Sequence, residues 1–156
     1  MLAIVVTGAV LIVTSDRDTA APGGVAQVAA SAVPNDVGRR FALGAEFDDP
    51  IAIVPSAPQC GLRVYEGRTA GNGQFCVIHW SMINPGGERR VLVQPVVSML
   101  DDRGAEHDPA PITLPPAILP GARVDGAFVF DLPMYRKPVK MTATMLENGT
   151  QIEVAL

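Results

Sequence analysis

The dipeptide Asn148-Gly149, set between two alternating apolar segments, most constrains what this chain can fold into. Asn-Gly is the strongest short hairpin signal, because both positions of a type I′ turn need positive φ. A two-residue loop there puts apolar residues on one face of the hairpin, opposing Met145 with Ile152, Ala143 with Val154 and Met141 with Leu156. Thr144 would lie opposite Glu153 on the other face. The pairing and the face pattern agree, so a C-terminal hairpin is predicted.

A second hairpin is predicted around Asn84-Pro85-Gly86-Gly87. Before this turn, apolar positions alternate with other side chains in the order Cys76, Ile78, Trp80 and Met82. The apolar stretch 91–100 follows the turn and would supply the partner strand. Trp80 is the only tryptophan, and we expect it at the centre of the core.

Further turns punctuate the rest of the chain at short intervals. Asp101-Asp102-Arg103-Gly104 has turn-favouring residues, and Leu119-Pro120-Gly121 precedes an apolar strand at 127–130. With 15 Gly and 14 Pro and no convincing amphipathic helix, an all-β antiparallel sandwich or barrel is indicated. The residues expected to be most buried are Ile78, Trp80, Phe128, Phe130, Met145 and Val154.

These motifs, in this order, resemble the telokin-like, immunoglobulin-like domain family of bacterial surface proteins, whose function is unknown. The resemblance covers about residues 37–156 and rests on a strand opening at Gly73–Ile78, the terminal Asn84, the turn at Asp101–Gly104, Leu119–Gly121 and Phe128–Pro133. It implies an immunoglobulin-like antiparallel β-sandwich in a secreted or anchored protein. Lipid-anchored members carry a cysteine after the apolar run. This chain has none there, so lipidation is not supported.

The N-terminal run Leu2 to Val13 is apolar and uncharged. It spans roughly 18 Å as a helix, which is less than the roughly 30 Å hydrocarbon core of a membrane. It also lacks the basic region of a signal peptide. Three interpretations remain open: a membrane anchor completed by upstream residues, a signal peptide, or a buried strand or helix. We favour a transmembrane or signal-anchor helix, with the domain on the extracytoplasmic side.

The predicted organisation is therefore an anchor or signal segment at 1–15, a flexible tether at 16–38 and the sandwich at 39–156. Ala, Pro and Gly dominate the tether without a helical or strand period, although a partly helical stretch at Val25–Ala32 is an alternative.

Cys60 and Cys76 are the only cysteines. In an exported domain an even count favours one disulfide, which would stabilise the fold by about 3 kcal/mol for a loop of this size. Two free buried thiols are an alternative. A metal or redox pair is the least favoured, because the chain has no C-x-x-C motif.

The densest group of potential metal ligands is Asp101, Asp102, Glu106, His107 and Asp108. Its spacing matches no known calcium loop, so a solvated acidic hairpin is the better explanation. His79 is expected on the exposed strand face opposite Trp80. Zinc needs three or four protein ligands, which two isolated histidines and two paired cysteines do not supply. No metal or cofactor is therefore predicted.

Sequence signals for catalysis are lacking. Gly71-Asn72-Gly73 has no phosphate-binding context, and no nucleophile elbow, Walker loop or dinucleotide fingerprint occurs. Two histidines leave little material for a Ser/His/Asp triad. The net charge of −4 argues against nucleic acid as a partner. The prediction is a non-enzymatic, membrane-anchored binding or accessory module that contacts another membrane protein, for example an auxiliary subunit of a respiratory assembly. The alternative is a free secreted or surface-displayed ligand-binding protein.

Overall fold

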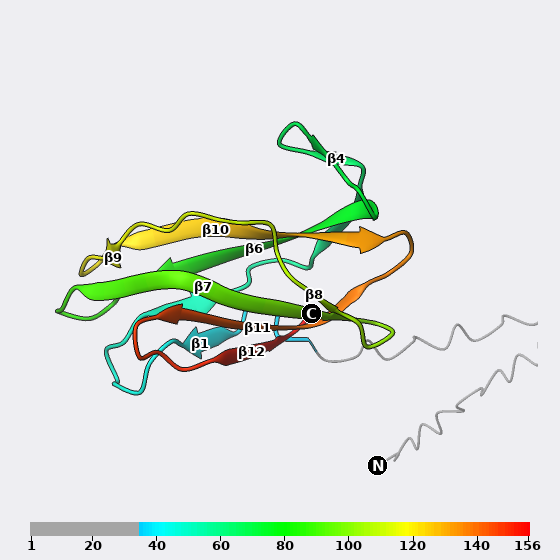
Figure 1. The fold of residues 1–156 in the computed structure, drawn as a ribbon. Coiled ribbons are helices and arrows are strands. Elements are labelled where there is room, and N and C mark those ends of the chain that lie inside the picture. Colours follow the sequence, from blue (N-terminus) through cyan, green and yellow to red (C-terminus); the bar gives the residue numbers. More distant parts are fainter. Residues whose placement is uncertain (1–34) are drawn as a thin grey trace, which may run out of the picture. The chain divides into compact units, whose positions relative to one another are not determined.

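The computed structural model describes residues 35–156, which form an all-β domain of two packed antiparallel sheets (Figure 1). The strands of the first sheet, in spatial order, are β1 (Arg40–Ala42), β2 (Ile51–Ile53), β6 (Gly73–Ile83) and β10 (Arg123–Pro133). β3 (Gln59–Leu62) also pairs with β6. This part of the chain contains no helix, as the turn-rich sequence predicted.

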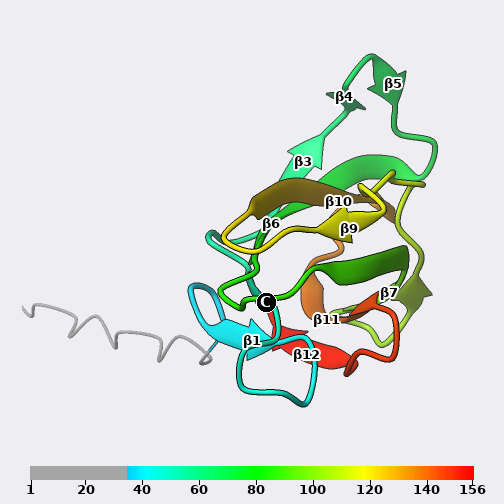
Figure 2. The same cartoon turned by 90° about the vertical axis from the view of Figure 1, so that its left-hand side faces the viewer.

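The second sheet has the order β12 (Ile152–Ala155), β11 (Pro138–Leu146), β7 (Arg90–Asp101) and β8 (Glu106–His107). β9 (Ala117–Ile118) pairs with the opposite end of β7. A small hairpin of β4 (Val64–Tyr65) and β5 (Arg68–Thr69) projects from the sandwich, and we call residues 59–70 the flap (Figure 2).

The core lies between the sheets and is centred on the long pair of β6 and β10. Trp80 stacks on Phe128 with ring centroids 5.6 Å apart, and both are almost completely buried. Gly126 lies opposite Trp80, and a Cβ there would overlap the indole ring, so the strand pair needs a glycine at this position. The six residues predicted to be most buried are each at most 3% exposed.

The C-terminal hairpin is present, but its predicted register is wrong. Ala143 lies opposite Ile152 and Met141 opposite Val154, two residues away from the two-residue-loop pairing. The shift preserves the buried face because side chains alternate with a period of two. The longer connection arises because Thr150 N donates to the carbonyl of Leu43 at 2.9 Å, which holds this part of the turn against another loop.

The predicted hairpin around Asn84-Pro85-Gly86-Gly87 is also wrong. β6 and β7 lie in different sheets, so residues 84–89 cross from one sheet to the other. The buried side chain of Asn84 explains the crossing. Its amide nitrogen donates to the carbonyls of Glu88, at 2.8 Å, and Ile118, at 3.2 Å, which directs the chain away from β6.

The domain begins slightly earlier than predicted. Residues 36–38, assigned to the tether, hydrogen-bond to the sandwich through Asp36 N to Ala155 O, Ala155 N to Asp36 Oδ2 and Gly38 N to Val54 O. The predicted anchor helix and residues 1–34 lie outside the described residues. Within 35–156, no helix is long and apolar enough to cross a membrane.

Candidate functional site

Cys60 and Cys76 form a disulfide, as predicted. Cys76 is completely buried on the central strand β6, whereas Cys60 is half-buried on β3. β3 pairs with β6 only at Gln59 and Leu62, with an irregular register between them. The covalent link therefore secures the base of the flap at a short and irregular strand pairing.

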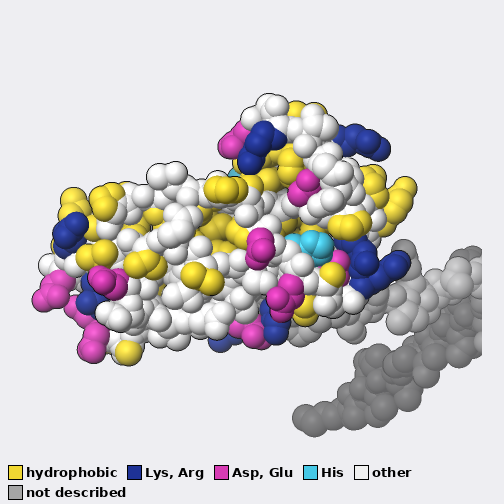
Figure 3. All heavy atoms as spheres, in the orientation of Figure 1, with side chains coloured by type: hydrophobic (Ala, Val, Ile, Leu, Met, Phe, Trp, Pro, Cys, Tyr) yellow, Lys and Arg dark blue, Asp and Glu magenta, His cyan; other side chains and the backbone are white. Residues whose placement is uncertain are grey.

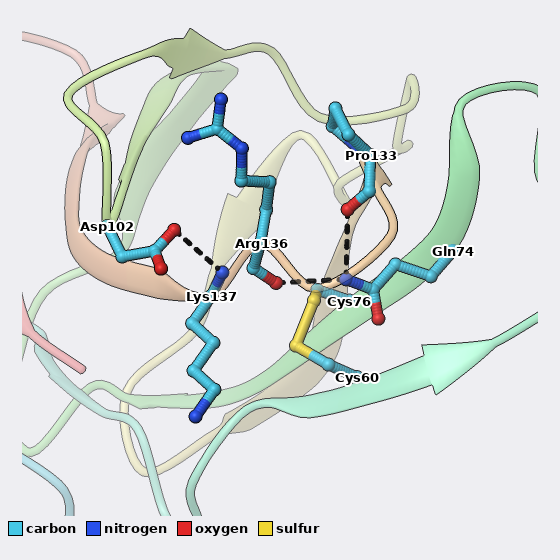
Figure 4. The surroundings of a disulfide bond; sticks show 7 residues. All are labelled: Cys60, Gln74, Cys76, Asp102, Pro133, Arg136 and Lys137. Atoms are coloured by element: carbon cyan, nitrogen blue, oxygen red, sulfur yellow. Dashed lines mark hydrogen bonds between the residues drawn. A yellow bond between two sulfur atoms is a disulfide. The ribbon is translucent and has the colours of Figure 1, made fainter.

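The surroundings of the disulfide are structural (Figure 4). The amide of the buried Gln74 donates to the carbonyls of Pro133 and Arg136, at 3.1 and 2.9 Å. These bonds hold the β10–β11 turn against β6. The backbone N–H of Lys137 donates to the Asp102 carboxylate at 3.2 Å. The first contact ties a turn to a strand, and the second ties two turns together.

The acidic turn after β7 is also structural, but the prediction that it is solvated is wrong for Asp101, which is 1% exposed. Oδ1 of Asp101 accepts the N–H groups of Arg103 and Ala105, and Oδ2 lies 3.0 Å from His107 Nε2. Burial raises the pKa of Asp101, but His107, these amides and the Arg136 charge outweigh it and lower the pKa to about 2. Among the described residues, no three potential ligands are grouped to hold a metal.

His79 is exposed on β6 between buried neighbours, as predicted, and does not join His107. The structure thus brings together Asp101 and His107, whereas His79 lies on the face of β6 opposite to Cys76 and the disulfide.

Four connections gather at the opposite end of the sandwich and form what we call the loop end. They are residues 43–50, 84–89, 119–122 and 147–151, and Figure 2 looks onto them. Asn84 joins two of them, because its N–H donates to Ala122 O at 3.0 Å and its carbonyl accepts the N–H of Gly121 at 2.8 Å. The β11–β12 turn is tied in by the bond from Thr150 to Leu43. These bonds join the loops in two pairs, and the two pairs meet where the backbone of Gly86 packs against Asp48.

An ion pair between the buried Asp49 and the partly exposed Arg90 lies at the base of these loops. Oδ2 of Asp49 also accepts the N–H of Glu46 at 2.8 Å, which closes the loop on itself. Gly44 has no room for a Cβ beside this carboxylate. A cavity of about 410 Å³ opens above the pair and is lined by the 43–50 loop, Arg89, Arg90 and the β11–β12 turn.

Phe47 is the most exposed large apolar side chain of the described domain, with a relative exposure of 105%. It lies at the tip of the 43–50 loop, between the exposed acids Glu46 and Asp48. Glu88 and Glu147 add two further exposed acids, and none of these four carboxylates is in an ion pair within residues 35–156. The loop end therefore presents an exposed aromatic ring together with four acids and the exposed Arg89.

Sequence reasoning did not identify Phe47, Asp49 or Arg90. The available signal was an aromatic residue within the polar segment Glu46 to Pro50, between two short strands. An isolated aromatic is more often buried than displayed, so this signal alone does not indicate a surface role.

Comparison with known proteins gives no functional assignment. No protein family model and no curated protein matches the chain. A solved structure described as a conserved hypothetical protein from Bacillus anthracis is similar to it, with 14% identity and a TM-score of 0.39. That match covers 78% of this chain and 99% of the other. Similarity at this level supports no statement about function, so the resemblance to the telokin-like family stays a prediction.

Proposed function

We propose that the chain is a non-enzymatic, membrane-anchored binding or accessory module that contacts a partner protein through the loop end. Its immunoglobulin-like domain would lie outside the cytoplasm, where it would serve an integral membrane complex as an auxiliary subunit. The disulfide between Cys60 and Cys76 supports this location, because disulfides persist in oxidising compartments and are rare in the cytosol.

The single observation that carries the proposal is the complete exposure of Phe47. Burying a phenylalanine side chain is worth about 2 kcal/mol, so an exposed ring at a loop tip supplies an anchor for a partner's pocket. The acidic residues Glu46, Asp48, Glu88 and Glu147 would meet a basic rim on that partner, which favours correct orientation.

The direction of the chain also supports the loop end as the contact surface. Asp36 pairs with Ala155 at one end of the sandwich, and β1 runs from there toward the 43–50 loop at the other end (Figure 1). A domain held through its N-terminal side would therefore present the loop end away from the attachment.

The test is Phe47→Ala in the full chain, extracted in mild detergent, with the partner identified by mass spectrometry and then purified for a binding measurement. We expect the variant to weaken binding by about tenfold to a hundredfold, the equivalent of one buried aromatic side chain. Val64→Ala is the matched control, since Val64 is 58% exposed but lies on the flap.

Equal affinity of Phe47→Ala and wild type for the purified partner would contradict the loop end as the contact. Recovery of the chain in the soluble fraction without detergent would contradict membrane anchoring and favour a free secreted protein.

A further inference from the structure

β10 is the edge strand of the first sheet, and part of its outer edge is unpaired. Backbone groups of successive residues in a strand point to opposite sides. Val129 O accepts the N–H of Ala110 at 2.8 Å, on the side away from β6. Asp125 and Ala127 therefore also direct their N–H and C=O groups outward. No partner for these four groups exists within residues 35–156.

The segment 108–116 runs beside this edge but bonds elsewhere. After Ala110, its hydrogen bonds go toward β7, from Gln94 Nε2 to Ile112 O at 3.2 Å and from Leu92 N to Pro116 O at 3.1 Å. Pro111, Pro115 and Pro116 have no N–H to donate to β10. A cavity of about 340 Å³ consequently opens between the segment and the edge of β10.

The cavity borders both faces of the β10 edge. Trp80, Ile112 and Leu114 line it on the core side, where the latter two pack against the main core. Tyr65, from the flap, and Val129 line it on the outer side, where both belong to a second apolar cluster. Apolar side chains are exposed in the notch between the projecting flap and the body of the domain (Figure 3).

This arrangement matches the needs of an added β-strand. Such a strand pairs through its backbone and places alternate side chains on opposite faces of the sheet. Here the unpaired backbone N–H and C=O groups of Asp125 and Ala127 are two residues apart, which is the spacing at which an added strand forms hydrogen bonds. Apolar walls are available to the side chains on either face.

The charges at the cavity favour an uncharged occupant. Asp125 is neutralised by Arg123, whose Nε donates to both carboxylate oxygens at 2.8 and 3.0 Å. Glu66 and Arg68, which also line the cavity, contribute one charge of each sign. A polyanion such as a nucleic acid finds no net positive charge here, whereas a neutral, apolar polypeptide segment does not need one.

We propose that the β10 edge from Asp125 to Ala127 is a docking site for an extended segment of a partner polypeptide. The segment adds to the first sheet as a strand, with an apolar side chain against Trp80 on one face and another against Tyr65 on the other. This site is separate from the loop end, and its occupation does not require Phe47.

The probe is a short blocked peptide with a central run of consecutive Val residues, which supplies apolar side chains to both faces, and with one Lys and one Glu at its ends. It is titrated into the isotope-labelled full chain in detergent micelles. We expect NMR shifts at the amides of Asp125 and Ala127 and at the indole N–H of Trp80. Hydrogen exchange at Ala127 should slow about tenfold, because its N–H becomes bonded. The same peptide with methylated backbone nitrogens should give none of these changes.

Ala127→Pro supplies the matched protein variant, because it removes an outward N–H on an edge strand without breaking a bond to β6. It should lose the peptide response, while Phe47→Ala should keep it. If Ala127→Pro does not fold, the methylated peptide still decides the question. The proposal is overturned by the absence of shifts at millimolar peptide or by equal binding of the methylated peptide. Protection of Asp125 and Ala127 in the free full chain would overturn it as well, by showing that the chain's own residues fill the edge.

Discussion

Gly126 faces Trp80 across the central strand pair, and the space of its missing side chain is occupied by the indole ring. Gly126→Ala should therefore destabilise the domain by roughly 1–3 kcal/mol, the usual cost of overpacking a core. Urea unfolding followed by the fluorescence of Trp80 measures this. Gly87→Ala is the control, since Gly87 has open space around its Cα and no positive φ, and it should change stability by less than about 0.5 kcal/mol. Similar losses in the two variants would show that the ring does not constrain Gly126.

Asp101 also acts at the scale of a single residue, through the pH dependence of stability. Its pKa is lowered from 3.8 to about 2 in the folded domain, despite the opposing effect of burial. A depressed folded pKa contributes stability above the unfolded pKa and loses it as the pH falls through the folded value. Asp101→Asn should therefore be less stable than wild type at pH 6, and the two should converge as the pH falls from about 4 to 2. Urea midpoints across this range test it, and a constant difference would contradict it.

Among the elements, the flap depends most on a single link. The structure predicts that Cys60→Ala loosens residues 59–70, because β3 has only two register pairs with β6. Unfolding free energy should fall by about 3 kcal/mol, as for other loops of this size. Amide exchange should increase more in the flap than in the β6–β10 pair, where protection falls only with the global free energy of unfolding. Alkylation of both cysteines in the unreduced wild-type protein would contradict the disulfide.

The elements also show how far local sequence patterns reach. Alternation at Met141, Ala143 and Met145 correctly assigned the buried face of β11, because burial acts on each strand separately. The register of the hairpin was wrong because Thr150 bonds to Leu43, a contact between residues distant in sequence. The crossing at Asn84 escaped prediction for the same reason, since its partner Ile118 lies on β9.

At the scale of the whole molecule, an all-β sandwich could be predicted because turn residues recur between short alternating segments. The disulfide could be predicted because the chain has two cysteines, Cys60 and Cys76, and two cysteines allow a single intramolecular pairing. The loop end could not be predicted from local patterns, because four connections from distant parts of the sequence form it. The cavity beside β10 could not be predicted either, because it depends on where the segment 108–116 leaves that strand.

The pairing of Asp36 with Ala155 has a mechanical consequence. If a partner binds the loop end and force is applied to the chain at Asp36, that force acts along the length of β1. The bonds that oppose it lie across the pull: those of the β1–β2 pair, Gly38 N to Val54 O, and the two between Asp36 and Ala155. Hydrogen bonds in this shear arrangement bear the force together rather than breaking one after another. Through the bonds of Asp36, the force is shared between β1 of the first sheet and β12 of the second.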